Sequence, residues 1–525
     1  MLRRARRAQE NGELEKAERL YNALLQHRPQ RFDALHGLGQ IKYLRGNLPT
    51  ALVLIQEALK ADCARAEGFA SLGLVFHALK DFARALRSFD EGLRLAPDSA
   101  ELRNRRGVAL LELGRTREAL ADFECVLAAD PEHLDALGNR GNALFRLNRP
   151  AEAIEVYDRA LQRKPADPAL LTNRAIALRR LDRPHEALMS ATRALAAQPD
   201  FAPARFVEAS VRLALGDFAA GWRGYEWRWG GALAAQRRRL AAPLWLGEES
   251  LAGKSILLHA EQGFGDTIQF VRYVPLLASR GARVVLEAQP QLVRLLSGMT
   301  GLASVIARGQ TLPGFDYHCP LLSLPLAFGT ELATIPAGVP YIVPPADRLS
   351  TWQERLPKRR PLVGLAWSGE RAHENDVNRS VGLAVLKPLL DVQDVQFVAL
   401  THDVREDDAR FLKERPEVLQ IGQDFSDFAD TAAVIASLDA VISVDTAVAH
   451  LAGAMGKPLF LLLPFAADFR WLRERRGSPW YPTARLFRQQ RFADWSNAVE
   501  ALCQDLTRAT FLRSSSRTER NNPAA

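Results

Sequence analysis

Residues 442–458 have the sequence ISVDTAVAHLAGAMGKP. The apolar run that ends at Val444 predicts a strand, and the small and apolar residues after Thr446 predict a helix. Asp445 and Thr446 then stand at the helix start, where short polar side chains cap free backbone N–H groups. Those N–H groups and the helix dipole predict a diphosphate site at Thr446 and Ala447, with His450 one turn further along. The same residues also fit a capped helix with a packed histidine.

Strand-like and helix-like segments alternate on both sides of this stretch. Short β-rich runs occur at 255–260, 283–288, 304–307 and 317–320, and again at 361–369, 395–400, 438–445 and 458–464. The proline-rich stretch 336–345 between the two sets is interpreted as a linker. Alternation with short loops predicts parallel sheets covered by helices on both faces. Two such Rossmann-like halves would enclose a cleft, with ligands beyond the carboxyl ends of the strands.

The loop after the first of these strands has the sequence HAEQGFGDTIQF, residues 259–270. Gly263 and Gly265 permit a tight turn, and Asp266 is expected to precede a helix and to face the cleft. A carboxylate on that rim suits a general base for an acceptor hydroxyl, and Glu261 is a second candidate. Asp266 also fits a plain helix N-cap. The pattern is neither a P-loop nor GxGxxG.

A polar loop follows the first strand of the second half, with the sequence AWSGERAHENDVNRS at 366–380. Ser368, Gly369, His373 and Arg379 are candidates to face phosphate oxygens, since an arginine fork bonds two oxygens at once. A solvated polar loop is the alternative interpretation of this segment.

The first 220 residues repeat with a period of 34. Small residues, bulky residues, glycines and prolines recur in four series: Ala17, Ala51, Ala85, Ala119, Ala153 and Ala187; Tyr21, Ile55, Phe89, Phe123 and Tyr157; Gly39, Gly73, Gly107 and Gly141; Pro29, Pro97, Pro131, Pro165 and Pro199. This length and pattern match the tetratricopeptide repeat (TPR), two short helices per unit with proline ending the second. About six units are expected to stack into one continuous core, and a helix at 201–215 is expected to cap them.

The array predicts a concave surface that binds a protein or peptide. Asn139 and Asn173 share one repeat position and are candidates to bind a peptide backbone, or else they pack locally. The aromatic-rich segment 216–229 is interpreted as a hydrophobic joint to the next domain, and segment 471–495 as a packed turn that locks the carboxy-terminal helix.

The motif SVDTAVAHLAGAMGKP, the GFGD loop and the two-halved α/β pattern resemble glycosyltransferase family 9, the heptosyltransferase family of GT-B fold. The resemblance covers roughly residues 250–510. The array in front is similar to the layout of the O-GlcNAc transferase family, and TPR-linked relatives share the SPWYP-like ending at 478–482.

This resemblance implies an inverting, metal-independent transfer of a sugar from a nucleoside diphosphate, with no further cofactor. It implies Asp266 as the base and Asp445, Thr446 and His450 as ligands of the donor diphosphate. Arg379 is the nearest match to the family's phosphate-binding basic residue, which is usually a lysine in a different local context. The loop 400–402 is the candidate contact to the nucleoside.

Bulk composition agrees with an ordinary globular protein of several domains. The chain has 525 residues and a net charge of +8, and its arginines are spread along the chain, which predicts no nucleic-acid site. No apolar stretch of 18 residues and no signal peptide are present, so we expect no membrane span and a cytoplasmic protein. The first helix is expected to begin almost at Met1, which leaves a start further upstream open. No DxD occurs between 240 and 510, so no metal site is expected, and the four cysteines are expected to be buried.

The predicted architecture is therefore an all-α TPR superhelix followed by an α/β GT-B fold. Its parts are the array at 1–215, a junction at 216–245, an acceptor-side half at 246–345, a donor-side half at 346–510 and a disordered tail at 511–525. The predicted function is transfer of a sugar from a nucleotide sugar to a protein or glycan hydroxyl. A TPR scaffold with an inactive GT-B-like domain is the alternative, and a sugar-nucleotide epimerase is disfavoured because the dinucleotide fingerprint is absent.

Overall fold

The structure, a computed structural model, describes residues 1–25, 31–231, 233–358 and 361–509. The chain divides into two compact units, Met1–Leu178 and Arg179–Ala525. The predicted tail at 511–525 lies outside the described residues.

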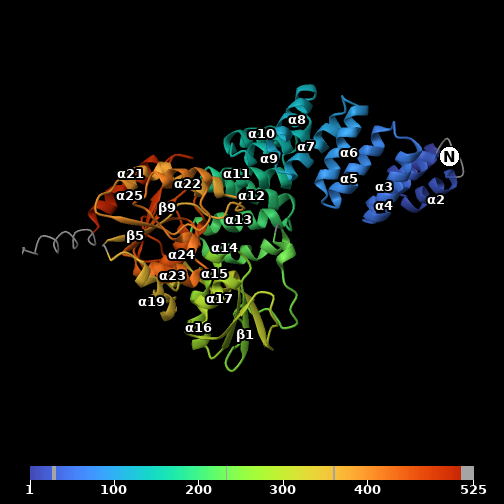
Figure 1. The fold of residues 1–525 in the computed structure, drawn as a ribbon. Coiled ribbons are helices and arrows are strands. Elements are labelled where there is room, and N and C mark those ends of the chain that lie inside the picture. The colour runs from blue at the N-terminus through green and yellow to red at the C-terminus, as the bar shows by residue number, and fades with distance from the viewer. Residues whose placement is uncertain (26–30, 232, 359–360, 510–525) are drawn as a thin grey trace, which may run out of the picture. The chain divides into compact units, whose positions relative to one another are not determined.

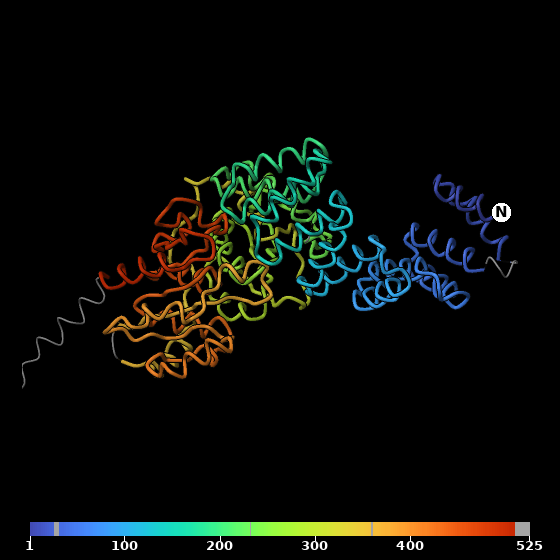
Figure 2. Tube along the Cα trace, turned by 90° about the horizontal axis from the view of Figure 1, so that it is seen from above, coloured from blue at the N-terminus to red at the C-terminus, as the bar shows by residue number. Residues whose placement is uncertain are grey.

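The first unit is built of helices only in its described part. The helices are α1 (Leu2–Glu10), α2 (Leu14–Leu24), α3 (Arg31–Leu44), α4 (Leu48–Ala61), α5 (Ala66–Ala78), α6 (Phe82–Leu95), α7 (Ala100–Glu112), α8 (Thr116–Ala129), α9 (Leu134–Arg146) and α10 (Pro150–Arg163), followed by α11 (Pro168–Arg180), which runs into the second unit. Each odd-numbered helix from α1 to α9 packs against the next (Figure 1), and the pairs follow one another in chain order (Figure 2).

The packing within each pair depends on the small and bulky residues of the repeat. A Cβ atom on Gly73 would lie 2.4 Å from the ring of Phe89, and one on Gly107 would lie 2.5 Å from the ring of Phe123. Only a residue without a side chain leaves room for these rings, so the predicted repeat and its all-α TPR array are confirmed.

The two asparagines predicted to bind a peptide instead form hydrogen bonds with asparagines of adjacent repeats. Asn139 donates through Nδ2 to Oδ1 of Asn104 at 3.0 Å, and Asn173 donates to Oδ1 of Asn142 at 2.9 Å. These contacts support the local-packing interpretation. Of the four cysteines predicted to be buried, Cys319 is buried and Cys503 is half-buried; the prediction is wrong for Cys63, in an exposed loop, and for Cys125, on the solvent face of α8.

The second unit begins with helices α12 (Pro184–Ala197), α13 (Ala202–Ala214) and α14 (Phe218–Tyr225), followed by the 3₁₀ turns η2 (Glu226–Gly230) and η3 (Ala234–Gln236). The helix predicted at 201–215 is present as α13, and α14 pairs with it, so helical pairing continues beyond residue 215. Trp222 and Tyr225 of α14 share one hydrophobic core with the strands that follow. The aromatic segment is therefore part of the hydrophobic core of the second unit.

A four-stranded parallel sheet follows, in the order β3-β2-β1-β4. Its strands are β1 (Ser255–His259), β2 (Arg283–Ala288), β3 (Leu302–Ala307) and β4 (Tyr317–Pro320); its helical segments are α15 (Phe264–Phe270), η4 (Val271–Tyr273), α16 (Val274–Ser279), α17 (Pro290–Leu296), η5 (Leu321–Ser323), α18 (Leu324–Ala327) and η6 (Leu332–Thr334). All strands are parallel, and the chain order reverses between β1 and β4.

A six-stranded parallel sheet completes the unit, in the order β10-β9-β8-β5-β6-β7. Its strands are β5 (Leu362–Ala366), β6 (Gln396–Ala399), β7 (Leu419–Gln420), β8 (Ala440–Val444), β9 (Leu459–Leu463) and β10 (Ala484–Arg488); its helical segments are α19 (Ala346–Arg355), α20 (Asp376–Arg379), η7 (Leu383–Leu386), α21 (Lys387–Leu390), α22 (Glu406–Lys413), η8 (Gly422–Asp424), α23 (Phe428–Ser437), α24 (Ala447–Ala454), η9 (Phe469–Trp471) and α25 (Ser496–Arg508). Here the chain order reverses between β5 and β8, which pair directly.

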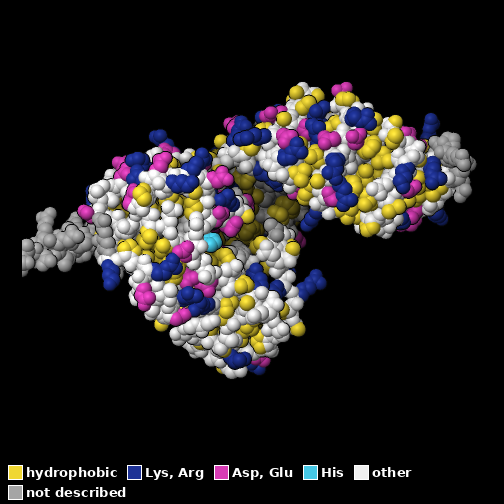
Figure 3. Space-filling model, in the orientation of Figure 1, with side chains coloured by type: hydrophobic (Ala, Val, Ile, Leu, Met, Phe, Trp, Pro, Cys, Tyr) yellow, Lys and Arg dark blue, Asp and Glu magenta, His cyan; other side chains and the backbone are white. Residues whose placement is uncertain are grey.

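Hydrophobic cores lie on both faces of the larger sheet, and one of them is continuous with the core of the smaller sheet. In the described part of the chain, no helix is long and apolar enough to cross a bilayer. On the face shown in Figure 3, acidic and basic side chains are intermixed on each unit.

Candidate functional site

The segments predicted to bind the donor lie where the chain order of the larger sheet reverses. Ser368 and Gly369 follow β5, and Asp445 follows its neighbour β8. The GFGD loop follows β1, at the equivalent reversal of the smaller sheet. Parallel sheets bind ligands at such points, because the loops from the two strands there diverge and leave a crevice.

The GFGD loop and the start of α24 are in contact. A Cβ atom on Gly265 would lie 2.7 Å from Cδ2 of His450 and 3.6 Å from Cα of Ala447. Helices α15 and α24 pack together over this contact (Figure 1). The structure therefore brings together the two segments that the sequence predicted separately as base loop and diphosphate site.

For the sugar transfer that the sequence predicts, we expect Gly265→Ala to lower turnover by about 10²-fold, because a shift of about 1 Å between catalytic groups has that effect. The added methyl group must displace His450, which is itself packed between other side chains. Gly314→Ala is the matched control, because a Cβ atom at this exposed position would meet nothing within 4 Å. Equal turnover by the two variants would contradict a functional role for this close contact.

Asp266 lies inside the first turn of α15, whereas the sequence analysis placed it before the helix. The helix begins at Phe264, because Asp266 caps it from within, accepting from the Gly263 N–H at 2.8 Å through Oδ2. Its Oδ1 accepts from Arg470 in an ion pair. The side chain is 17% exposed, so the candidate base is held by two donors and still partly open to solvent.

Thr446 is the N-cap residue of α24, as predicted, but its hydroxyl caps no backbone N–H. Instead Oγ1 of Thr446 lies 3.1 Å from Oγ of Ser443. Thr446 and Ala447 are both half-buried. The first N–H groups of α24 thus lack the cap that threonine usually supplies, which is the arrangement an anion would complete.

His450 is a buried, neutral side chain. Its Nδ1 lies 2.9 Å from the Tyr481 hydroxyl, and its ring stacks on Trp471 with centroids 5.4 Å apart. Burial lowers the pKa of His450 well below its ordinary value, and nearby guanidinium groups act in the same direction. His450 can therefore offer a hydrogen bond to a phosphate but no positive charge.

Asp445 lies beside His450, with Oδ1 3.7 Å from Nε2 of the imidazole. Burial, together with the nearby Asp468 carboxylate, raises the pKa of Asp445 to about 6. An ionised carboxylate repels a diphosphate, whereas a protonated one can donate to it. Asp445 thus favours an anionic ligand most when it is protonated.

Arg379 joins the polar loop to this cluster. Its Nη1 donates to the backbone carbonyl of Asp445 at 3.2 Å, and a Cβ atom on Gly369 would lie 2.6 Å from its guanidinium. Ser368 is buried, and the Gly369 N–H donates to Oγ of Ser380 at 3.1 Å. The segment is therefore ordered by specific contacts around one cation, unlike a freely solvated loop.

Glu261 points into a different network. It is buried and ion-paired with Nη2 of Arg228 at 3.1 Å, in the segment after α14. Burial raises the pKa of Glu261 to about 7, against the opposing effect of Arg228. Arg228 also bonds Glu226 and Ser323, so Glu261 anchors the GFGD loop to the aromatic joint.

Two further residues of the cluster were not predicted. Arg470 and Asp468 follow β9 and stand next to Asp266 and Asp445. A single arginine after a strand has no local signature; only its position beyond the carboxyl end of a parallel strand could have pointed to it.

The loop 400–402, the predicted contact to the nucleoside, follows β6. Thr401 is buried there, and Nδ1 of His402 lies 3.0 Å from the Gly422 carbonyl oxygen.

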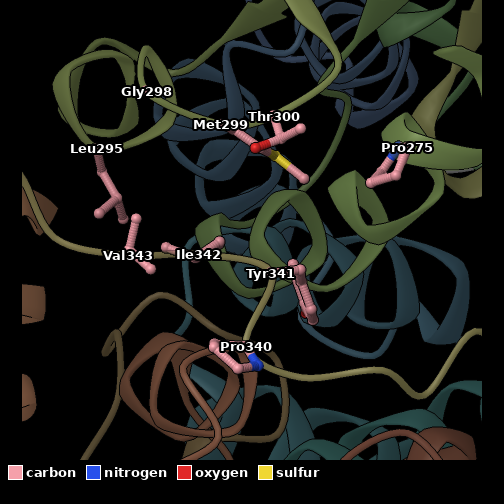
Figure 4. A pocket seen from close by; sticks show the side chains of 9 residues that line it. All are labelled: Pro275, Leu295, Gly298, Met299, Thr300, Pro340, Tyr341, Ile342 and Val343. Carbon is pink, nitrogen blue, oxygen red and sulfur yellow. The ribbon is translucent and has the colours of Figure 1, made fainter.

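Two cavities lie apart from these residues. One of about 220 Å³ is lined by Pro275, Leu295, Gly298, Met299, Thr300 and residues 340–343 (Figure 4). Another of about 330 Å³ lies in the first unit between α5, α7 and α9. Among the described residues, no group of three His, Cys, Asp or Glu side chains could hold a metal ion.

Comparison with known proteins gives separate matches for the two parts of the chain. The family model described as tetratricopeptide repeat matches residues 2–67, 70–123 and 104–168. The model described as glycosyltransferase family 9 (heptosyltransferase) matches residues 426–463, which contain α23, β8 and α24.

Among curated proteins, "Protein FlbA" of Caulobacter vibrioides (strain ATCC 19089 / CIP 103742 / CB 15) is 27% identical over 325 residues. The match covers 56% of this chain and 53% of FlbA, so the chain spans about half the length of that relative.

The solved structures that match include TPR proteins. One, from Parabacteroides merdae ATCC 43184, is 18% identical with a TM-score of 0.38, covering 43% of this chain and 89% of that one. Another is YrrB, a TPR protein with an unusual peptide-binding site, 18% identical with a TM-score of 0.30 and coverages of 35% and 95%. The family and sequence matches together support a TPR-linked, glycosyltransferase-like protein.

Proposed function

We propose that the second unit is a nucleotide-sugar-dependent glycosyltransferase, and that the TPR array recruits its acceptor or a partner protein. In this proposal the two parallel sheets are the Rossmann-like halves of a GT-B fold, with the acceptor side at 246–345 and the donor side at 346–510. The carrying observation is the contact of Gly265 with His450 and Ala447, which places a carboxylate loop from one sheet against an uncapped helix start from the other.

The proposed reaction inverts the anomeric carbon and uses no metal. An acceptor hydroxyl oxygen attacks that carbon, its proton passes to Asp266, and the bond from carbon to the diphosphate oxygen breaks. The departing nucleoside diphosphate gains negative charge. In this proposal the N–H groups at the start of α24, the neutral His450 and the Arg379 guanidinium stabilise that charge.

One observation favours the scaffold alternative. Both carboxylate oxygens of Asp266 already accept hydrogen bonds, from Gly263 and Arg470. A carboxylate that accepts hydrogen bonds at both oxygens is a weaker base. An inactive domain that retains the GT-B fold could therefore show the same contacts around Asp266. The two functions differ in whether a nucleotide sugar binds and is turned over.

The test is a thermal-shift screen of the full chain with UDP-, GDP-, ADP- and dTDP-linked sugars, followed by measurement of nucleoside diphosphate release. A true donor raises Tm, because it binds only the folded state. No shift and no release with any of these compounds would overturn the proposal. A shift without release would favour the scaffold.

For the compound that binds, we expect His450→Ala to weaken affinity about 10- to 100-fold, the effect of losing one hydrogen bond to a charged group. Calorimetric titration measures this directly. His185→Ala, at an exposed position of α12, is the control and should bind as the parent does. Unchanged affinity of a folded His450→Ala protein would show that the imidazole does not contact the nucleotide sugar.

A further inference from the structure

We propose that Arg470 is a positioning residue of the transfer reaction, holding the Asp266 carboxylate in place while sharing its charge with Asp468. The inference rests on the proposed function, in which Asp266 is the base. Arg470 lies in η9, which follows a strand of the larger sheet, whereas Asp266 lies in α15, which follows a strand of the smaller sheet.

The guanidinium of Arg470 is divided among three partners. Its Nε donates to Oε1 of Gln269 at 2.7 Å and its Nη1 to Oδ1 of Asp468 at 2.7 Å, while Nη2 pairs with Asp266. Gln269 and Asp266 both lie on α15, three residues apart and hence on one face of the helix. Arg470 thus contacts that face through Gln269 and through Asp266, and the two contacts fix the orientation of the carboxylate.

The surroundings keep the guanidinium itself in one place. Arg470 is buried in the turn η9, and its guanidinium carbon lies 4.6 Å from the ring centroid of Phe469 and 5.8 Å from that of Phe270. Asp468 starts the turn, where its Oδ1 also accepts from the Arg470 N–H at 3.1 Å. A planar cation with five donors in a fixed fork suits such a position better than lysine would.

The charges around Asp266 make this one cation important. The titratable groups that face the base come from several elements: Arg470 and Asp468 at η9, Asp445 and His450 at α24 with Arg379 behind them, Glu261 in the preceding loop, and Tyr225 of α14. Three aspartates, at 266, 445 and 468, therefore surround one central guanidinium. Without Arg470 the ionised base would lose its ion-pair partner, while the Asp468 carboxylate that shares the guanidinium would remain nearby.

Two effects on turnover follow. Without the Arg470 guanidinium, the Asp266 carboxylate loses one of its two recorded donors and can turn away from the acceptor, so kcat falls while the KM for the nucleotide sugar stays within a few-fold of the parent value. Lysine at position 470 keeps a positive charge beside Asp266, so it restores part of kcat. A purely structural arginine would not separate kcat from KM in this way.

The experiment measures kcat and KM for nucleoside diphosphate release by the full chain, using the nucleotide sugar from the screen that gives the largest shift in Tm. The variants are Arg470→Gln, Arg470→Lys and Asp468→Asn. We expect Arg470→Gln to lower kcat about 10²-fold, because displacing a catalytic group by about 1 Å has that effect. Arg470→Lys should have a kcat between those of Arg470→Gln and the parent, because a point charge replaces the fork.

Asp468→Asn keeps the oxygen that caps η9 and lies at a side chain 38% exposed, so it tests the inference even where Arg470→Gln does not fold. We expect a lower kcat with a KM near the parent value, because the neutral amide no longer holds the guanidinium by charge. A parental kcat in a folded Arg470→Gln, or a kcat and KM that change together in Asp468→Asn, overturns the positioning role while parental turnover leaves the proposed function intact. Absence of turnover in the parent overturns the proposed function, and this inference with it.

Discussion

Asp266→Asn is expected to lower nucleotide-sugar turnover by about 10²- to 10⁴-fold, the usual contribution of a general base. The amide cannot take up a proton from the acceptor, although its oxygen can still accept from the Gly263 N–H that the carboxylate now caps. Donor affinity should stay within a few-fold of the parent, since the diphosphate is proposed to bind at α24. Single-turnover release and calorimetric titration separate the two effects.

The control for this substitution is Asp347→Asn. Asp347 is an aspartate of the same unit with a 62% exposed side chain, and its ion pair within the described residues is with Arg294 at the surface. Exposed ion pairs contribute about 1 kcal/mol or less, so this variant should match the parent in both rate and stability. Parental turnover by a folded Asp266→Asn protein would remove the aspartate from the chemistry and leave Glu261 as the remaining candidate.

Trp222→Ala is expected to destabilise the second unit by about 3–5 kcal/mol, the cost of emptying a buried tryptophan site. Its ring makes edge contacts with Phe218, Tyr225, Phe270 and Phe469, at centroid distances of 6.0, 5.8, 6.1 and 5.6 Å. These partners come from α14, α15 and η9, so the cavity would open between these three segments. Scanning calorimetry should show a lowered Tm for the transition of the second unit.

Two companion substitutions sharpen this test. Trp227→Ala removes a half-buried ring whose recorded contact is with Arg205, at 5.6 Å, and should cost about 1 kcal/mol or less. Trp222→Phe keeps most of the volume and removes an indole N–H that has no hydrogen-bond partner among the described residues, so it should cost less than the alanine variant. Equal stability of Trp222→Ala and the parent would contradict the joint as a packing element.

Local patterns were enough for much of the architecture. The strands at 283–288 and 317–320 have the predicted bounds, and the glycines and rings of the repeat meet as their spacing required. Strand β10 was missed because ARLFR follows a proline-rich turn and contains two arginines, so it lacks a continuous apolar run. The start of α15 was placed too late because a helix capped by its own Asp266 has no polar N-cap residue.

What the sequence determined by itself is therefore the order of elements: a helical repeat, then strand–helix units, with polar residues at the strand ends. Periodicity and capping act over a few residues, so they are visible along the chain. The partners of those polar residues were decided only by the tertiary structure. Asp266 pairs with Arg470, which is 204 positions away in the chain. Glu261 pairs with Arg228 and not with the residues around Asp445. Burial raises the pKa of Asp445 to about 6. Pairing and desolvation depend on which strand ends meet in space, and no local pattern encodes that meeting.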